Sequence, residues 1–131
     1  MREQSTAILV VEDDEDVRDT ISDMLVKAGF QVRTAGTGLE ALKIIDHQSI
    51  DMLVADIRLP GGISGLEMTQ CARAHHPALK CLFISGQLGP VVCNPELDDF
   101  VAKPFRAAEL IGCVWKVLRG NNPRPRVEVM R

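Results

Sequence analysis

Residues 52–56 read Met-Leu-Val-Ala-Asp, and this short stretch decides how the rest of the chain is interpreted. Four consecutive apolar residues are typical of a strand that is buried on both faces of a sheet. Asp56 ends the run, although a charged group gains nothing from burial in an apolar strand. We therefore expect Asp56 to lie at the tip of a strand, where its carboxylate serves a function.

Three other apolar runs also stop at polar residues, and the chemistry of each stop differs. They are residues 7–11 before Glu12 and Asp13, residues 81–84 before Ser85, and residues 100–102 before Lys103. The carboxyl ends of parallel strands share one edge of a sheet, which is where ligands bind in open α/β folds. The four ends therefore predict one site, with carboxylates, a hydroxyl and an ammonium suited to a divalent metal and a phosphoryl group.

The chain alternates strands and helices with short connections. Apolar residues at helical spacing predict helices over 14–28, 38–47, 65–75 and 106–119. The helix at 38–47 is expected to bury Leu39, Leu42 and Ile45. With a further strand at 31–35, the pattern predicts a single-domain α/β fold, a doubly wound five-stranded parallel sheet covered on both faces.

The segment 86–99 has the least regular pattern, because glycines and prolines interrupt it. Only residues from about 95 to 99 have a composition that suits a helical turn, so we expect a short or irregular fourth helix here. We assign residues 1–120 to the domain. Residues 121–131 contain two prolines and three arginines without helical periodicity, and we interpret them as a flexible tail or a linker stub.

The bulk composition narrows the function classes. A net charge of −3 gives no reason to expect direct contact with nucleic acid. Apolar runs of about five residues are too short to span a membrane, and the first residues lead into a strand without a signal-peptide pattern. The four cysteines form no CxxC pair, which favours a reducing, cytoplasmic setting.

In their order and spacing, the strand-end motifs resemble the receiver domain of response regulators in two-component signalling. The matching segments are Val10-Val11-Glu12-Asp13, Val54-Ala55-Asp56-Ile57-Arg58-Leu59-Pro60, Ile84-Ser85-Gly86 and Phe100-Val101-Ala102-Lys103-Pro104-Phe105. The resemblance covers about residues 7–119 and implies a flavodoxin-like sheet with strand order 2-1-3-4-5. The loop at 59–65 and the strand end at 83–86 resemble receivers attached to hybrid histidine kinases.

The resemblance also implies a chemistry for the acidic residues. Asp56 would accept a phosphoryl group from the phosphohistidine of a histidine kinase or of a phosphotransfer protein in a phosphorelay. Glu12, Asp13 and Asp56 would hold Mg²⁺ together with the backbone carbonyl of Arg58. Such a domain is a signalling module with only self-phosphorylation and autodephosphorylation activity, and not an enzyme acting on a metabolite.

The remaining strand ends would transmit the signal. By resemblance, Lys103 contacts the phosphoryl group, Ser85 moves toward it, and Phe100 is the switch aromatic that turns inward behind Ser85. Between Ser85 and Lys103 the chain is shorter than is usual in the family. We therefore expect a monomer that does not dimerise through the fourth helix, the fifth strand and the helix that follows.

Two other functions remain open at this point. A flavodoxin-like nucleotide or flavin binder needs backbone that cradles phosphates after the first strand, whereas residues 12–15 are all acidic here. A Mg²⁺-dependent phosphohydrolase with an aspartyl nucleophile needs a second general acid and a cap that excludes water. The residues after Asp56 are Ile57 and Arg58, which supply no such acid.

Overall fold

The structure is a computed structural model that describes residues 6–59, 62–86, 94 and 96–120. Its five strands are β1 (Ala7–Val11), β2 (Gln31–Ala35), β3 (Met52–Asp56), β4 (Lys80–Ser85) and β5 (Asp98–Ala102). They form one parallel sheet in the order β2-β1-β3-β4-β5, which confirms the predicted topology. The helices are α1 (Glu15–Lys27), α2 (Gly38–His47), α3 (Gly65–Arg73) and α4 (Ala107–Leu118).

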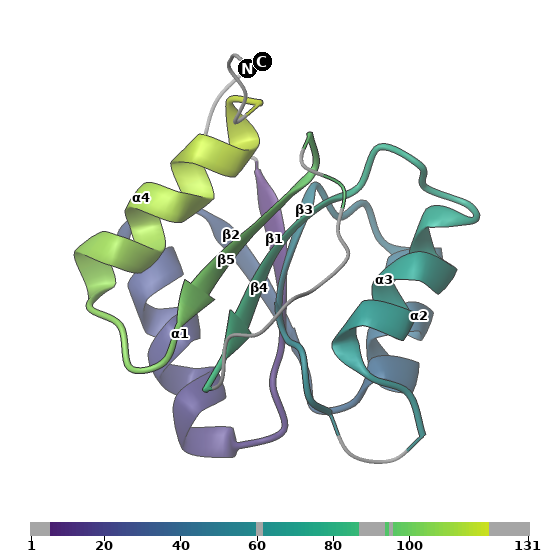
Figure 1. Cartoon of the computed structure of the whole chain (residues 1–131), viewed down its shortest axis with the longest axis horizontal. Coiled ribbons are helices and arrows are strands. Elements are labelled where there is room, and N and C mark those ends of the chain that lie inside the picture. Colours follow the sequence, from purple (N-terminus) through teal and green to yellow (C-terminus); the bar gives the residue numbers. More distant parts are fainter. Residues whose placement is uncertain (1–5, 60–61, 87–93, 95, 121–131) are drawn as a thin grey trace.

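The helices cover both faces of the sheet, with α1 and α4 on one side and α2 and α3 on the other (Figure 1). Alternate residues of each strand therefore enter different cores. Ile8 and Val10 pack toward α1 and α4, whereas Leu9 and Val11 pack toward α2 and α3. All five residues of β3 are buried, as expected for a central parallel strand.

Polar residues fix the starts of the helices that leave the carboxyl edge of the sheet. The Asp14 carboxylate accepts hydrogen bonds from the Asp16 and Val17 amides, at 2.9 and 3.2 Å. Ser64 and Glu67 form a reciprocal capping box at the start of α3. Because these caps satisfy amides that lack a partner within the helix, they define where each strand-to-helix loop ends.

The orientation of α2 corrects one expectation from the sequence. The side chains that α2 buries belong to Ala41 and Ile45, whereas Leu39 is 55% exposed. Leu39 lies six residues before Ile45, which rotates it by roughly 120° around the helix axis at 3.6 residues per turn. Both residues therefore cannot face the sheet, and the small Ala41 lies on the buried side.

The connection between β4 and β5 ends in a single turn close to the helical turn expected near residues 95–99, but the turn is shorter than expected. Asp98 and Asp99 already belong to β5, which begins two residues earlier than the apolar run suggested. The amides of Leu97 and Asp98 both donate to the Asn94 carbonyl, so a tight turn leads directly into the strand. Residues 87–93 and 95, where most of the expected short or irregular fourth helix falls, lie outside the described residues, as does the tail 121–131.

Within the described parts of the chain, no helix has the length and apolar character needed to cross a membrane.

The cysteines provide a chemical test of this packing. Cys81 lies in β4 with no exposed surface, and burial, reinforced by the charge of Asp98, raises the pKa of its thiol. Cys71 is exposed on α3. Alkylation of the native protein with iodoacetamide, followed by peptide mass spectrometry, is therefore expected to label Cys71 and to spare Cys81 until urea is added. Equal labelling of both thiols in the native state would contradict the burial of β4.

Candidate functional site

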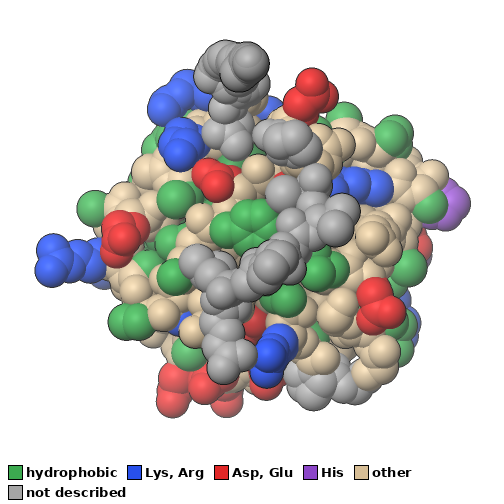
Figure 2. Space-filling view, in the orientation of Figure 1, with side chains coloured by type: hydrophobic (Ala, Val, Ile, Leu, Met, Phe, Trp, Pro, Cys, Tyr) green, Lys and Arg blue, Asp and Glu red, His purple; other side chains and the backbone are tan. Residues whose placement is uncertain are grey.

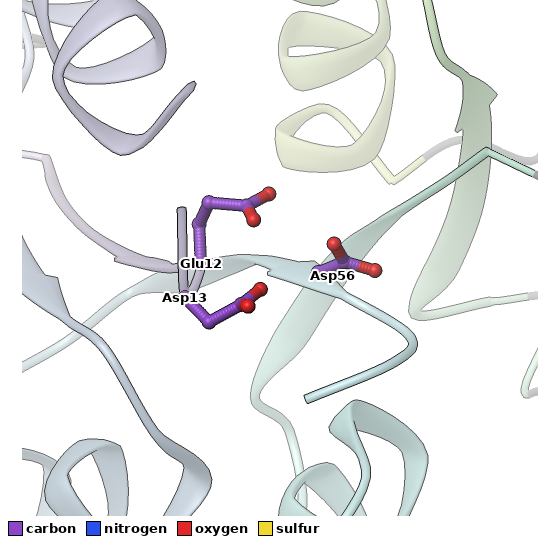
Figure 3. Close-up of side chains that lie close together, drawn as sticks. All are labelled: Glu12, Asp13 and Asp56. Carbon is purple, nitrogen blue, oxygen red and sulfur yellow. The ribbon is translucent and has the colours of Figure 1, made fainter. Parts of the chain in front are cut away.

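Three carboxylates lie together at the carboxyl edge of the sheet. Glu12 and Asp13 follow β1, Asp56 ends β3, and one carboxylate oxygen from each lies within 4.8 Å of the others (Figure 3). Pairing of Val11 with Ala55 sets this arrangement, because it brings the next residues of the two strands side by side. Glu12 and Asp56 are 1% and 7% exposed, whereas Asp13 is open to solvent.

The Lys103 ammonium lies between the two buried carboxylates. Its Nζ donates to Glu12 Oε1 at 3.1 Å and to Asp56 Oδ2 at 2.9 Å. Lys103 directly follows β5, and its amide donates to the Ser85 carbonyl at 2.8 Å, which extends the pairing of β5 with β4. The Lys103–Pro104 peptide bond is cis.

Burial and charge act against each other in this cluster. Burial raises the pKa of Glu12, and the nearby Asp56 charge adds to this, although hydrogen bonds from the Asp14 amide and from Lys103 oppose it. Burial by itself would lower the pKa of Lys103, but its bonds to Asp56 and Glu12 outweigh that and raise it. The site therefore keeps the ammonium charged while it concentrates negative charge around it.

Backbone and side-chain donors hold the buried acids in place. The Arg58 amide donates to Asp56 Oδ1 at 3.0 Å, and the Asp14 amide donates to Glu12 Oε2 at 3.2 Å. Arg18 Nη1 donates to the Glu12 backbone carbonyl at 3.0 Å. The role of Arg18 could not be predicted from the sequence. A single arginine in a predicted helix does not indicate that its side chain will contact the backbone of the preceding strand end.

Exposed acids continue the negative surface around the cluster. Asp13, Asp14, Glu15 and Asp16 are all exposed, and acidic side chains gather along the lower edge of the molecule in Figure 2. Three of these acids lie at the start of α1, namely Asp14, Glu15 and Asp16. Their negative charges interact favourably with the positive end of the helix dipole.

The predicted switch residues lie next to the cluster on β4 and β5. Ser85 is the last residue of β4 and is buried. Phe100 pairs with Phe83 across the two strands, and their rings stack at a centroid distance of 5.4 Å with 27° between the planes. Phe100 is half-buried in this position. All the residues singled out from the sequence thus occupy the ends of β1, β3 and β4 or the strand β5 and its end.

The carboxylates form a donor set that suits Mg²⁺. This ion prefers hard oxygen ligands and is bound in proteins by one or two carboxylates together with other oxygen atoms. The acidic cluster of Glu12, Asp13 and Asp56 is consistent with such a site.

The fold and the acidic pocket define a signalling module with the features of a phosphoacceptor site. The family model of the response regulator receiver domain matches residues 8–114, and the chain belongs to this family. Receiver domains are the modules that histidine kinases phosphorylate.

Relatives of known name share this domain. The chain is 37% identical over 116 residues to the uncharacterized transcriptional regulatory protein YrkP of Bacillus subtilis, covering 86% of this chain and 49% of YrkP. It is 36% identical over 120 residues to the transcriptional regulatory protein CreB of Escherichia coli, covering 88% of this chain and 52% of CreB. The chain thus spans about half the length of these two relatives.

Solved structures share the fold. A response regulator receiver protein of Sinorhizobium medicae superposes with a TM-score of 0.79 at 26% identity, covering 90% of this chain and 98% of that one. The receiver domain of the hybrid histidine kinase CckA superposes with a TM-score of 0.73 at 32% identity, covering 86% of this chain and 98% of that one. A hybrid-kinase receiver is thus among the structural neighbours, as the resemblance suggested.

Gly65 determines how closely α3 approaches the site. Its amide donates to the Ile57 carbonyl at 2.8 Å, and a Cβ atom at this position would overlap the Asp56 backbone carbonyl. The first residue of α3 therefore lies directly against the backbone of the central acid. No other residue type fits here without moving either α3 or the end of β3.

Gly65→Ala is expected to destabilise the fold by about 1–3 kcal/mol, because the added methyl group overpacks a buried backbone contact. Gly112→Ala is the matched control, since a Cβ atom at Gly112 in α4 would meet nothing within 4 Å. This control should stabilise the protein by about 0.5–1 kcal/mol, because alanine favours helix more than glycine does. Urea denaturation measures both, and equal effects of the two substitutions would contradict the close approach at Gly65.

Proposed function

We propose that this receiver accepts a phosphoryl group on Asp56 from the phosphohistidine of a histidine kinase or of a phosphotransfer protein. The observation that carries the proposal is the position of Asp56, 7% exposed at the end of β3, with one carboxylate oxygen 2.9 Å from the Lys103 ammonium. Phosphoryl transfer needs mainly positioning of the reactants and neutralisation of charge, and this cluster has groups for both.

The proposed reaction balances without another co-reactant. An oxygen of the Asp56 carboxylate attacks phosphorus, the phosphorus–nitrogen bond of the donor breaks, and its electron pair returns to the imidazole. The Arg58 amide, which donates to Asp56 Oδ1, keeps the carboxylate oriented during the attack. Lys103 pairs with oxygens of the arriving phosphoryl group, and Ser85, at the end of β4, donates its hydroxyl to another of these oxygens.

Mg²⁺ would be held by Glu12, Asp13, Asp56 and the backbone carbonyl of Arg58, and it supplies positive charge that offsets the negative phosphoryl oxygens. Asp13 is the exposed member of the acidic cluster, whereas Glu12 is buried and already bonded to Lys103. In this arrangement Asp13 faces the side from which the ion and the donor arrive.

The added charge on Asp56 then shifts a conformational equilibrium. Ser85 moves toward the phosphoryl group, and Phe100 leaves its half-exposed position against Phe83 to turn inward behind Ser85. The output is a change in the surface that a partner binds. The domain comprises residues 1–120 and acts in the cytoplasm as a monomer. It does not contact nucleic acid itself. It catalyses only its own phosphorylation and dephosphorylation.

Asp56→Asn is expected to abolish phosphorylation, because it removes the nucleophilic oxygen at the end of β3. Incubation with acetyl phosphate and Mg²⁺, followed by intact-mass measurement, should show a single phosphate adduct on the wild type and none on the variant. Asp46→Asn, an exposed position in α2, serves as the control and should behave like the wild type. An adduct on Asp56→Asn, or equal labelling in EDTA, would refute the assignment.

Mg²⁺ is expected to stabilise the wild type, because binding to the native state alone adds about 2.7 kcal/mol when the ion is at a hundredfold excess over its dissociation constant. Asp13→Ala should lose this response, and in EDTA it should melt at a higher temperature than the wild type because one of three adjacent negative charges is gone. Asp19→Ala, exposed on α1, is the control that keeps the response. Thermal melts that show the same Mg²⁺ effect on all three proteins would rule out a shared site.

A further inference from the structure

Arg73 connects three elements on the α3 side of the sheet. It is the last residue of α3, and its Nε and Nη2 donate to the Leu79 carbonyl just before β4, at 2.9 and 2.8 Å. Its guanidinium also forms a two-pronged ion pair with Asp98, with Nη2–Oδ1 at 2.6 Å and Nη1–Oδ2 at 3.3 Å. Such paired bonds fix geometry as well as energy, because both planar groups must align.

Asp98 is buried although it is charged. Its side chain is 1% exposed and that of Arg73 is 19% exposed. Asp98 also accepts a hydrogen bond from the Asn94 amide at 2.8 Å, which closes the turn that leads into β5. Burial of a carboxylate destabilises the fold unless its hydrogen-bonding and charged partners are in place. The burial of Asp98 therefore suggests that the ion pair with Arg73 has a specific role.

Asp98 is the first residue of β5, and this strand is at the edge of the sheet. In the described residues β5 pairs only with β4, and it is five residues long. Its far end leads directly to Lys103, whose ammonium reaches Asp56 and Glu12. An edge strand has a neighbour on one side only, so contacts outside the sheet supply a larger share of what holds it in place than they do for a central strand.

We propose that the Arg73–Asp98 ion pair is a positioning device that holds the start of β5 against α3 and β4, and thereby sets the position of the Lys103 ammonium at the phosphoacceptor site. The part of this inference that is tested by phosphorylation rests on the proposed function, that is, on Asp56 as the phosphoacceptor. Asp98 and Lys103 are about 16 Å apart along an extended strand, so the pair acts through the strand and not by contact with the site. A displacement of about 1 Å at a reacting group is enough to cost up to a hundredfold in rate.

The chain contains a matched control on the same strand. Asp99, the next residue of β5, pairs with Lys116 of α4 on the opposite face of the sheet. That pair is longer, at 3.5 Å, and more open, with Lys116 59% and Asp99 26% exposed. Loss of such an exposed pair is expected to have little effect, so Lys116→Ala separates the role of the buried pair from the loss of any ion pair to β5.

The test compares Asp98→Asn, the double variant Arg73→Met/Asp98→Asn and the Lys116→Ala control with the wild type. The double variant leaves no buried charge without its partner, so it keeps the test available if the single variant fails to fold. Three quantities are measured on the folded proteins. They are the Mg²⁺ dissociation constant, the rate of phosphorylation by acetyl phosphate, and the hydrogen-exchange rate of the Lys103 amide.

If the pair positions β5, both Asp98 variants phosphorylate about tenfold more slowly or worse, whereas their Mg²⁺ dissociation constant does not rise. Glu12, Asp13 and Asp56 come from β1 and β3, which the pair does not contact, and a displaced Lys103 ammonium competes less with the ion for Glu12 and Asp56. The Lys103 amide, bonded to the Ser85 carbonyl, exchanges at least about tenfold faster, whereas amides in β1 and β3 do not. The Lys116→Ala control is expected to match the wild type in Mg²⁺ dissociation constant, phosphorylation rate and hydrogen-exchange rate of the Lys103 amide.

An unchanged phosphorylation rate in both Asp98 variants, or an equal acceleration of exchange in all five strands, would overturn the inference. The second result would mean that the pair contributes only to global stability. If the wild type itself takes up no phosphoryl group, the proposed function fails. Hydrogen exchange at Lys103 then decides the positioning role by itself, because it requires no phosphorylation.

Discussion

The rest of the site depends on one ammonium held between two buried carboxylates. Lys103 reaches Glu12 and Asp56 only because β1, β3 and β5 all run in the same direction and end at the same edge. Carboxylates placed this close without a cation would repel each other and lose hydration, so the ion pairs make the acidic pocket compatible with a folded chain. The cluster still has three carboxylates for one ammonium, a donor set that suits a divalent cation.

Much of this arrangement is predictable from the sequence because it follows from the strand pattern. Apolar runs that stop at Glu12, Asp56, Ser85 and Lys103 indicate both the strands and their shared edge, and the parallel topology then brings the ends together. The resemblance to receivers adds the strand order. None of these inferences requires knowledge of individual side-chain conformations.

The features that sequence reasoning missed depend on contacts between distant segments. Aspartate is common in turns, and nothing in the local sequence shows that Asp98 begins β5 or that it pairs with Arg73, twenty-five positions earlier. Arg18 was likewise missed, since its bond to the Glu12 carbonyl requires α1 to fold back beside β1. Leu39 was assigned to the core because it is apolar, but the rotation of α2 favours Ala41 there. Tertiary geometry decides these cases, and local propensity does not.

The division of the interior into two cores has a consequence for how the molecule tolerates change. The sheet separates the side chains packed under α1 and α4 from those packed under α2 and α3. Substitutions that share no contacts have nearly additive effects on stability. Each helical layer can therefore accept substitutions with little dependence on the other, so the outer surface on one side can change while the packing on the opposite side is kept.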